Sequence, residues 1–286
     1  KVGNILQYRL IIPLPRLRSV LIFLLTSNGS HRQWPLFARN QAFTELNKDS
    51  DFPRIERDWH STLHCMNERS HLCESHEEEV ANAVSHGIGA ILSAVALGGM
   101  ICLALPLSVW HVIGVSVFGL SLVMLYLCSA VYHSVTRHPY KRLFQILDHS
   151  FIFVLIAGSY TPWLLVNLRG PWGWSLFAVV WALALSGVVM KTILLPRFEK
   201  VGTLIYVAMG WLICIAIQPL IENVSLSGLL WLIAGGVCYT GGVAFFVMKK
   251  MRFAHFIWHL FVMGGSLCHV VAVILGVLEP GDLARP

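Results

Sequence analysis

Charged side chains are scarce in this sequence. Only 13% of its 286 residues are Asp, Glu, Lys or Arg, whereas 56% are hydrophobic. The mean hydropathy is +0.67, a value at which a soluble domain would expose large apolar patches. The composition therefore excludes a soluble globular protein and predicts an integral membrane protein.

Other patterns are also missing. The apolar stretches are long and continuous, and they lack the alternation of period two that a transmembrane β-barrel requires. The seven cysteines show no CxxC pair or regular framework, so we interpret them as small core residues. The net charge of +6 does not indicate a nucleic-acid partner, because most basic residues lie in short connections between apolar segments.

Seven segments are long and apolar enough to cross about 30 Å of hydrocarbon as helices. Short connections join them, so neighbouring helices are expected to run antiparallel. We predict an all-α fold, a seven-transmembrane helix bundle, with spans at about residues 80–104, 107–134, 147–168, 172–194, 201–221, 227–248 and 254–278.

Loop charge predicts the orientation of this bundle. The connections after the second, fourth and sixth spans are basic, whereas the alternate connections carry almost no charge. Because basic loops face the cytoplasm, the N-terminus is predicted to be cytoplasmic and the C-terminus outside. The basic residues counted are Arg137, Lys141, Arg142, Lys191, Arg197, Lys200, Lys249, Lys250 and Arg252.

Residues 1–76 differ from the rest of the chain. They are polar and irregular, and the apolar run at 19–25 is too short to span a membrane. The first methionine is Met66, and the segment after it leads directly into the first span. We expect an irregular or disordered leader over 1–76 and a seven-helix membrane domain over 77–280, with Met66 as the hypothetical natural start.

Three histidines gather at one predicted depth. His133 lies near the cytoplasmic end of the second span, and His255 and His259 lie near the cytoplasmic start of the seventh. The last two are four residues apart, so their side chains project from one helix face and can bind one metal ion. A third imidazole from the second span leaves one position open, which is typical of catalytic zinc.

One acid and one hydroxyl are predicted at the same level. Asp148, the sole aspartate between residues 59 and 281, begins the third span, and Ser129 lies one turn before His133. Beside water activated by zinc, Asp148 would act as general base, and Ser129 would orient the water or the substrate carbonyl. The alternative is that these groups are polar contacts that hold helices together in the membrane.

Nearby polar residues are open to two interpretations. Asn82 and His86 begin the first span at the level of the site, where they either support the metal ligands or pack between helices. His149 projects about 100° away from Asp148 on a helix, so the two cannot face the centre equally. His269, deeper in the seventh span, is interpreted as a packing residue.

Five motifs occur in a fixed order over about residues 77–278: EEEVANAVSHGIGA, SAVYHS, LDHSFIFVLIAGSYTPWLL, YVAMGW and HFIWHLFVMGGSLCH. They resemble the bacterial hemolysin III family, which belongs to the group containing progestin and adiponectin receptors and is classed with alkaline ceramidases in the CREST superfamily. The first-span motif of the family, ExxNxxTH, appears here as Glu79, Asn82, Ser85 and His86, with serine in place of threonine. This replacement keeps the hydroxyl.

The resemblance implies seven helices with a cytoplasmic N-terminus and a zinc ion held by His133, His255 and His259. It also implies that Asp148 contacts water on the zinc ion and that Ser129 is the motif serine. The implied activity is that of a zinc-dependent hydrolase in the bacterial inner membrane, involved in membrane homeostasis, with a membrane lipid amide or ester as substrate.

Two other functions stay open at this point. A pore-forming or cytolytic channel would carry polar residues along its full depth, whereas the outer halves of the second, third and seventh spans are mostly apolar. A lipid sensor or receptor-like protein with a structural zinc ion would bind metal and lipid without turnover. Single-channel recording tests the first alternative, and a turnover assay tests the second.

Overall fold

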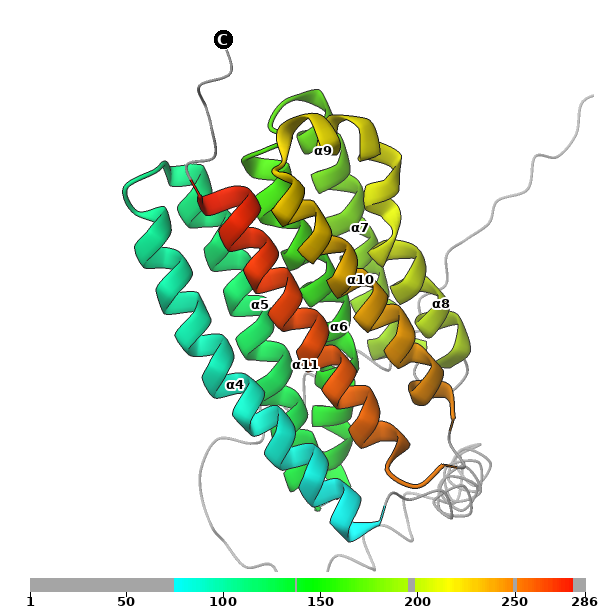
Figure 1. Ribbon diagram of the computed structural model, residues 1–286. Coiled ribbons are helices and arrows are strands. Elements are labelled where there is room, and N and C mark those ends of the chain that lie inside the picture. Colours follow the sequence, from blue (N-terminus) through cyan, green and yellow to red (C-terminus); the bar gives the residue numbers. More distant parts are fainter. Residues whose placement is uncertain (1–74, 137, 195–198, 249–250, 280–286) are drawn as a thin grey trace, which may run out of the picture. The chain divides into compact units, whose positions relative to one another are not determined.

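The computed structural model describes residues 75–136, 138–194, 199–248 and 251–279, all within the unit Leu72–Pro286. Every regular element in this part of the chain is helical (Figure 1). Seven helical segments are long and apolar enough to span a membrane, which confirms the predicted seven-span, all-α fold. Residues 1–74, which hold most of the predicted leader and Met66, lie outside the described residues.

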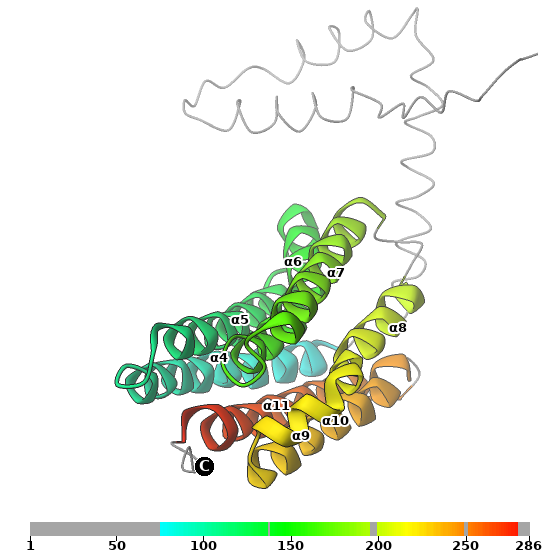
Figure 2. The same cartoon turned by 90° about the horizontal axis from the view of Figure 1, so that it is seen from above.

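The spans follow one another around the bundle, and the last packs against the first (Figures 1 and 2). The fifth span is divided among α8, η2 and α9, and the seventh ends in the π-helical turn η3. The elements are α4 (His76–Ala104), α5 (Val109–Ser134), α6 (His138–Leu165), α7 (Pro171–Leu194), α8 (Glu199–Gly210), η2 (Leu212–Ala216), α9 (Ile217–Asn223), α10 (Leu226–Val247), α11 (Ala254–Val273) and η3 (Ile274–Leu278).

The start of α4 is fixed by its own sequence. The hydroxyl of Ser75 accepts a hydrogen bond from the backbone N–H of Glu78 at 3.2 Å. Glu77, Glu78 and Glu79 fill the first turn, where negative charge interacts favourably with the helix dipole. This cap marks the start of α4, which lies at the same end of the bundle as the start of α11 (Figure 1).

The helix that contains the third span, α6, begins at His138, earlier than the predicted residue 147. Lys141, which the charge count assigned to a loop, lies inside α6 and donates hydrogen bonds to the Glu79 carboxylate and to the carbonyl oxygen of Tyr132. Lys191 likewise lies inside α7 and is buried. A helix continues past the apolar stretch when its polar groups find partners, and hydropathy does not register this. The orientation of the bundle stays a prediction.

Small residues bring the helices near the histidines together. A Cβ atom on Gly89 of α4 would lie 2.9 Å from the ring of Tyr126 in α5, and one on Gly265 of α11 would lie 2.9 Å from the ring of Tyr239 in α10. Both contacts require glycine, because a side chain would displace the facing ring. Tyr126 and Tyr239 both contact the Ser266 hydroxyl, at 2.6 and 2.8 Å.

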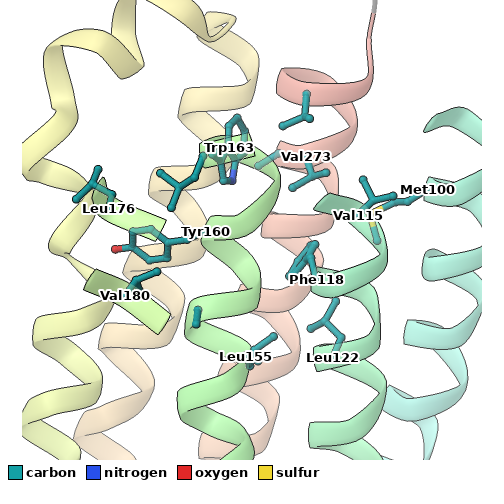
Figure 3. Close-up of a cluster of buried hydrophobic side chains, with 14 of the residues drawn as sticks. Met100, Val115, Phe118, Leu122, Leu155, Tyr160, Trp163, Leu176, Val180 and Val273 are labelled. Atoms are coloured by element: carbon teal, nitrogen blue, oxygen red, sulfur yellow. The ribbon is translucent and has the colours of Figure 1, made fainter. Parts of the chain in front are cut away.

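The apolar core fills the middle of the bundle. Figure 3 shows side chains of α4, α5, α6, α7 and α11 that meet there, including Phe118, Leu122, Trp163 and Val273, all at most 2% exposed. Hydrophobic burial does not drive helix association within lipid, so this close packing contributes through van der Waals contact.

The fifth span is interrupted, and a tyrosine of the third span fills the break. The hydroxyl of Tyr160 lies 2.7 Å from the carbonyl oxygen of Met209 and 2.9 Å from that of Gly210. It also accepts a hydrogen bond from the N–H of Ile213 at 2.9 Å. Backbone groups at membrane depth must be satisfied within the protein, and the Tyr160 hydroxyl satisfies such groups where α8 changes to η2.

Candidate metal centre

Three histidines from two helices meet at one end of the bundle. His133 lies in the last turn of α5, and His255 and His259 lie in the first turns of α11. One ring nitrogen of each lies within 4.8 Å of one ring nitrogen of each of the others. His259 is 1% exposed and His133 is 5% exposed. The group predicted from sequence spacing is thus brought together, within reach of a single metal ion.

The turn that precedes α11 has an unusual backbone conformation, and the histidines follow directly after it. Phe253, the residue before the helix, has a φ of 59°, in the left-handed region. Left-handed backbone costs a non-glycine residue about 1–2 kcal/mol. The guanidinium of Arg252 lies 5.1 Å from the Phe253 ring centre and binds the Glu77 carboxylate of α4 at 2.7 Å. Both side chains of this ion pair are largely exposed, at 72% and 70%, so the pair contributes little to holding the turn.

A small cavity adjoins the histidines. The centre of a water molecule could occupy about 20 Å³ of it. That is room for about one water. Asp148 and Ser129 line it, and both are buried, at 7% and 0% exposure. Asp148 also lies close enough to Ser129 and His133 to interact with them. The structure therefore places the predicted acid and hydroxyl beside the histidines.

Two further histidines line this cavity. His86 of α4 stacks on His259, with ring centres 3.5 Å apart, and its two nitrogens have no hydrogen-bond partner among the described residues. His149 lines the cavity together with its neighbour Asp148. The helical angle between them predicted that the two would not face the centre equally, and lining the same cavity does not contradict this. His269 lies apart, against the ring of Tyr239 at 5.2 Å.

Polar residues of α4 contact two of the three clustered histidines. The Nδ1 atom of His133 lies 2.7 Å from a carboxylate oxygen of Glu79, and the Nδ1 atom of His259 lies 3.4 Å from the hydroxyl of Ser85. Both residues belong to the first-span motif, but no role was predicted for either of them. Both residues lie in the first three turns of α4, at the level of the histidines, and this position was the signal that could have indicated a role.

A second cavity of about 440 Å³ lies next to the first. Its lining is mainly apolar and comes from α5, α6, α8, η2, α9, α10 and α11. Tyr160, Trp211 and His269 are among the side chains in this lining that carry a polar group. Five residues line both cavities and form their boundary: Leu125, Ile152, Phe246, Trp258 and Val262. An apolar chamber of this size is typical of a ligand site.

Seven apolar spans and a buried histidine cluster define the class: a multi-pass integral membrane protein whose helices can hold a metal ion between them. Sequence comparison gives the family. The family model described as Haemolysin-III related matches residues 74–270, so the chain belongs to this family. The match includes every residue of the centre, from Glu79 to His259.

Bacterial and animal proteins are similar to this chain over the same region. Hemolysin-3 of Bacillus cereus is 48% identical over 203 residues, which cover 71% of this chain and 93% of that protein. The Hemolysin-3 homolog of Bacillus subtilis (strain 168) is 44% identical over 199 residues, or 69% and 93% of the two chains. The human monocyte to macrophage differentiation factor is 27% identical over 202 residues, or 68% and 83%.

These matches confirm the resemblance to the hemolysin III family, and the human relative is consistent with the wider group that the resemblance implies. The family and the seven apolar helices are consistent with a multi-pass protein of the bacterial membrane.

Proposed function

We propose that this protein is a zinc-dependent hydrolase that cleaves a membrane lipid at an amide or ester bond. One observation carries the proposal: a buried carboxyl and a hydroxyl line the same small cavity as His255 and His259, and a ring nitrogen of His133 lies within 4.8 Å of those two imidazoles. Three imidazoles fit zinc and leave a position open. Asp148, which is outside the three-histidine set, is available as a general base.

The residues have separate roles in this reaction. Zinc bound to His133, His255 and His259 would supply Lewis-acid activation of water. Asp148 accepts a proton from water as the water oxygen attacks the lipid carbonyl carbon, and Ser129 hydrogen-bonds the carbonyl oxygen. The bond from carbon to nitrogen or oxygen then breaks, and Asp148 returns the proton to the leaving amine or alcohol. One water is consumed, and a fatty acid and an amine or alcohol are released.

The large apolar cavity supports a lipid as the substrate. Trp258 and Phe246 line both cavities, so an acyl chain in the large one would end beside Asp148. Apolar walls favour a hydrocarbon chain over an ion or a sugar. The same lining argues against the pore-forming alternative, because a conducting path needs polar groups along its length. The name Hemolysin-3 belongs to the relatives and does not specify how they act.

Metal content and turnover test the proposal on the full chain purified in detergent. We expect one zinc ion per chain, its loss in His259→Ala, and its retention in His111→Ala, a half-buried histidine that contacts Ser108 in another part of the bundle. Fatty-acid release from a panel of ceramides and glycerolipids, followed by mass spectrometry, is expected to need the metal. Absence of zinc from the wild type contradicts the proposal, and zinc without turnover points to the sensor alternative.

A further inference from the structure

The first span supplies none of the three clustered histidines, but its Glu79 makes a short contact with one of them. A carboxylate oxygen of Glu79 lies 2.7 Å from Nδ1 of His133. The His133 side chain is 1% exposed, whereas that of Glu79 is 28% exposed. The hydrogen bond therefore joins a buried imidazole to an acid at the edge of the bundle.

A lysine of the third span holds this acid in place. The ammonium group of Lys141 lies 3.0 and 3.2 Å from the two carboxylate oxygens of Glu79. It also donates to the carbonyl oxygen of Tyr132 at 2.9 Å and lies 4.2 Å from the centre of the Tyr132 ring. These interactions together fix the ammonium group. The Glu79 carboxylate is thus held by His133 of α5 and by Lys141 of α6.

We propose that Glu79 is a positioning residue for metal binding, acting through His133. A carboxylate paired with a lysine only accepts hydrogen bonds, so Nδ1 of His133 must carry the proton. The lone pair of the neutral ring then lies on Nε2, and the hydrogen bond fixes the direction of that atom. The inference rests on the proposed metal site and adds the residue that prepares one of its ligands.

The hydrogen bond from α4 to His259 is expected to be weaker than the one to His133, because its partner is not charged. Its Nδ1 atom lies 3.4 Å from the neutral hydroxyl of Ser85, which itself donates to the carbonyl oxygen of Asn82 at 3.0 Å. Charge-assisted hydrogen bonds are shorter and about twice as strong as neutral ones. Among these contacts from α4, the one from Glu79 is therefore expected to have the larger effect on metal affinity.

The experiment compares Glu79→Gln with Glu77→Gln on the same helix. Glu77 is exposed and binds Arg252 instead of a histidine, so both variants remove one negative charge, but only Glu79→Gln changes the partner of His133. Zinc affinity is measured by competition with a chromogenic chelator in the full chain in detergent. Loss of an acid that orients a ligand weakens binding by about 10- to 100-fold. We expect that loss in Glu79→Gln and less than about a twofold change in Glu77→Gln, a factor worth about 0.4 kcal/mol.

A second variant, Lys141→Gln, and a second measurement, the spectrum of bound cobalt, distinguish a positioning role of Glu79 from a role in folding. Lys141→Gln leaves the bond from Glu79 to His133 but frees the carboxylate, so its zinc affinity is expected to fall less than that of Glu79→Gln. The visible spectrum of the cobalt-substituted protein is expected to change in Glu79→Gln and to remain that of the wild type in Glu77→Gln. A purely structural role would lower the melting temperature of the metal-free protein and leave this spectrum unchanged.

The outcomes distinguish this inference from the proposed function. Equal zinc affinity in Glu79→Gln, Glu77→Gln and the wild type overturns the role of Glu79 and leaves the metal site standing. A wild type that binds no zinc overturns both. If Glu79→Gln does not fold, Lys141→Gln decides, and an affinity equal to that of the wild type overturns the proposal.

Discussion

The two cavities of the bundle adjoin each other but are built in different ways. The small one is lined by four histidines, a carboxyl and a hydroxyl, and it lies among α4, α5, α6, α10 and α11. The large one is mainly apolar and borders α8, η2 and α9. α8 packs less closely against its neighbours than the other spans do against theirs. The polar groups of the small cavity, which would have to hold a metal ion at fixed distances, thus lie between the more closely packed helices.

The difference follows from what each cavity has to do. A metal site needs ligands held by rigid elements and by hydrogen bonds to their second nitrogens. A chamber for a flexible chain needs only apolar walls and enough volume. The loosely packed fifth span serves the second purpose, because regions with sparse packing open at low free-energy cost. Substitutions that affect one cavity and leave the other unchanged test this separation.

Asp148→Asn is expected to have the largest effect. The amide keeps the size of the side chain but cannot accept a proton, and loss of a general base costs about 10²–10⁴-fold in rate. Zinc content is expected to remain at the wild-type level, because Asp148 is not one of the three clustered histidines. Lipid turnover and bound zinc are measured on the same preparation, with His259→Ala as the variant that loses both. Wild-type turnover in Asp148→Asn would remove the acid from the mechanism.

Tyr160→Phe is expected to lower stability and leave zinc affinity unchanged. The variant leaves the N–H of Ile213 and two carbonyl groups without the hydroxyl that binds them. An unsatisfied buried polar group costs about 1–3 kcal/mol. Thermal unfolding in detergent measures the loss. Tyr140→Phe is the matched control, since Tyr140 is 57% exposed. A change in zinc affinity in Tyr160→Phe would show that the two cavities are not independent.

The sequence predicted the span positions and the histidine cluster because both depend on local regularities. Apolar length gave the spans, and a separation of four residues on α11 gave the direction shared by His255 and His259. The ion pair of Glu79 with Lys141 was not predicted. Lys141 was used only as a basic loop residue that indicates the orientation of the bundle, so no ion-pair partner was sought for it. Only the packed bundle shows that the helix continues through Lys141.

The break in the fifth span could not be predicted for a different reason. Residues 209–216 are a continuous apolar stretch with no proline, so their sequence is typical of an uninterrupted helix. Tyr160, which is far away in the chain, binds the backbone at this point through its hydroxyl. The large cavity depends on this break, since Gly210, Trp211 and Ile213 all line it. The stretch 209–216 itself therefore carries no signal of its contact with Tyr160.

Gly236→Leu is expected to shorten the acyl chains that the protein accepts. A Cβ atom at Gly236 meets only the Trp211 ring, at 3.8 Å, so the leucine side chain can extend into the large cavity. We expect KM for long-chain substrates to rise about tenfold, as when the space for a few methylenes is filled, with short-chain turnover and zinc content unchanged. Gly98→Leu, where a Cβ atom meets no other atom within 4 Å, is the control. An unchanged chain-length profile would mean that the acyl chain lies elsewhere.

Ser85→Ala is expected to have the smallest effect and tests the small cavity alone. The hydroxyl lies 3.4 Å from Nδ1 of His259, a long contact between neutral groups. Such a hydrogen bond contributes about 0.5–1.5 kcal/mol, so zinc affinity should fall by about two- to tenfold, less than in Glu79→Gln. Ser186→Ala is the control, because the Ser186 hydroxyl binds only a carbonyl of its own helix. A loss in Ser85→Ala as large as that in Glu79→Gln would mean that hydrogen bonding matters in itself, whether or not the partner is charged. A smaller loss would support the view that the acid of α4, held by Lys141, prepares the centre.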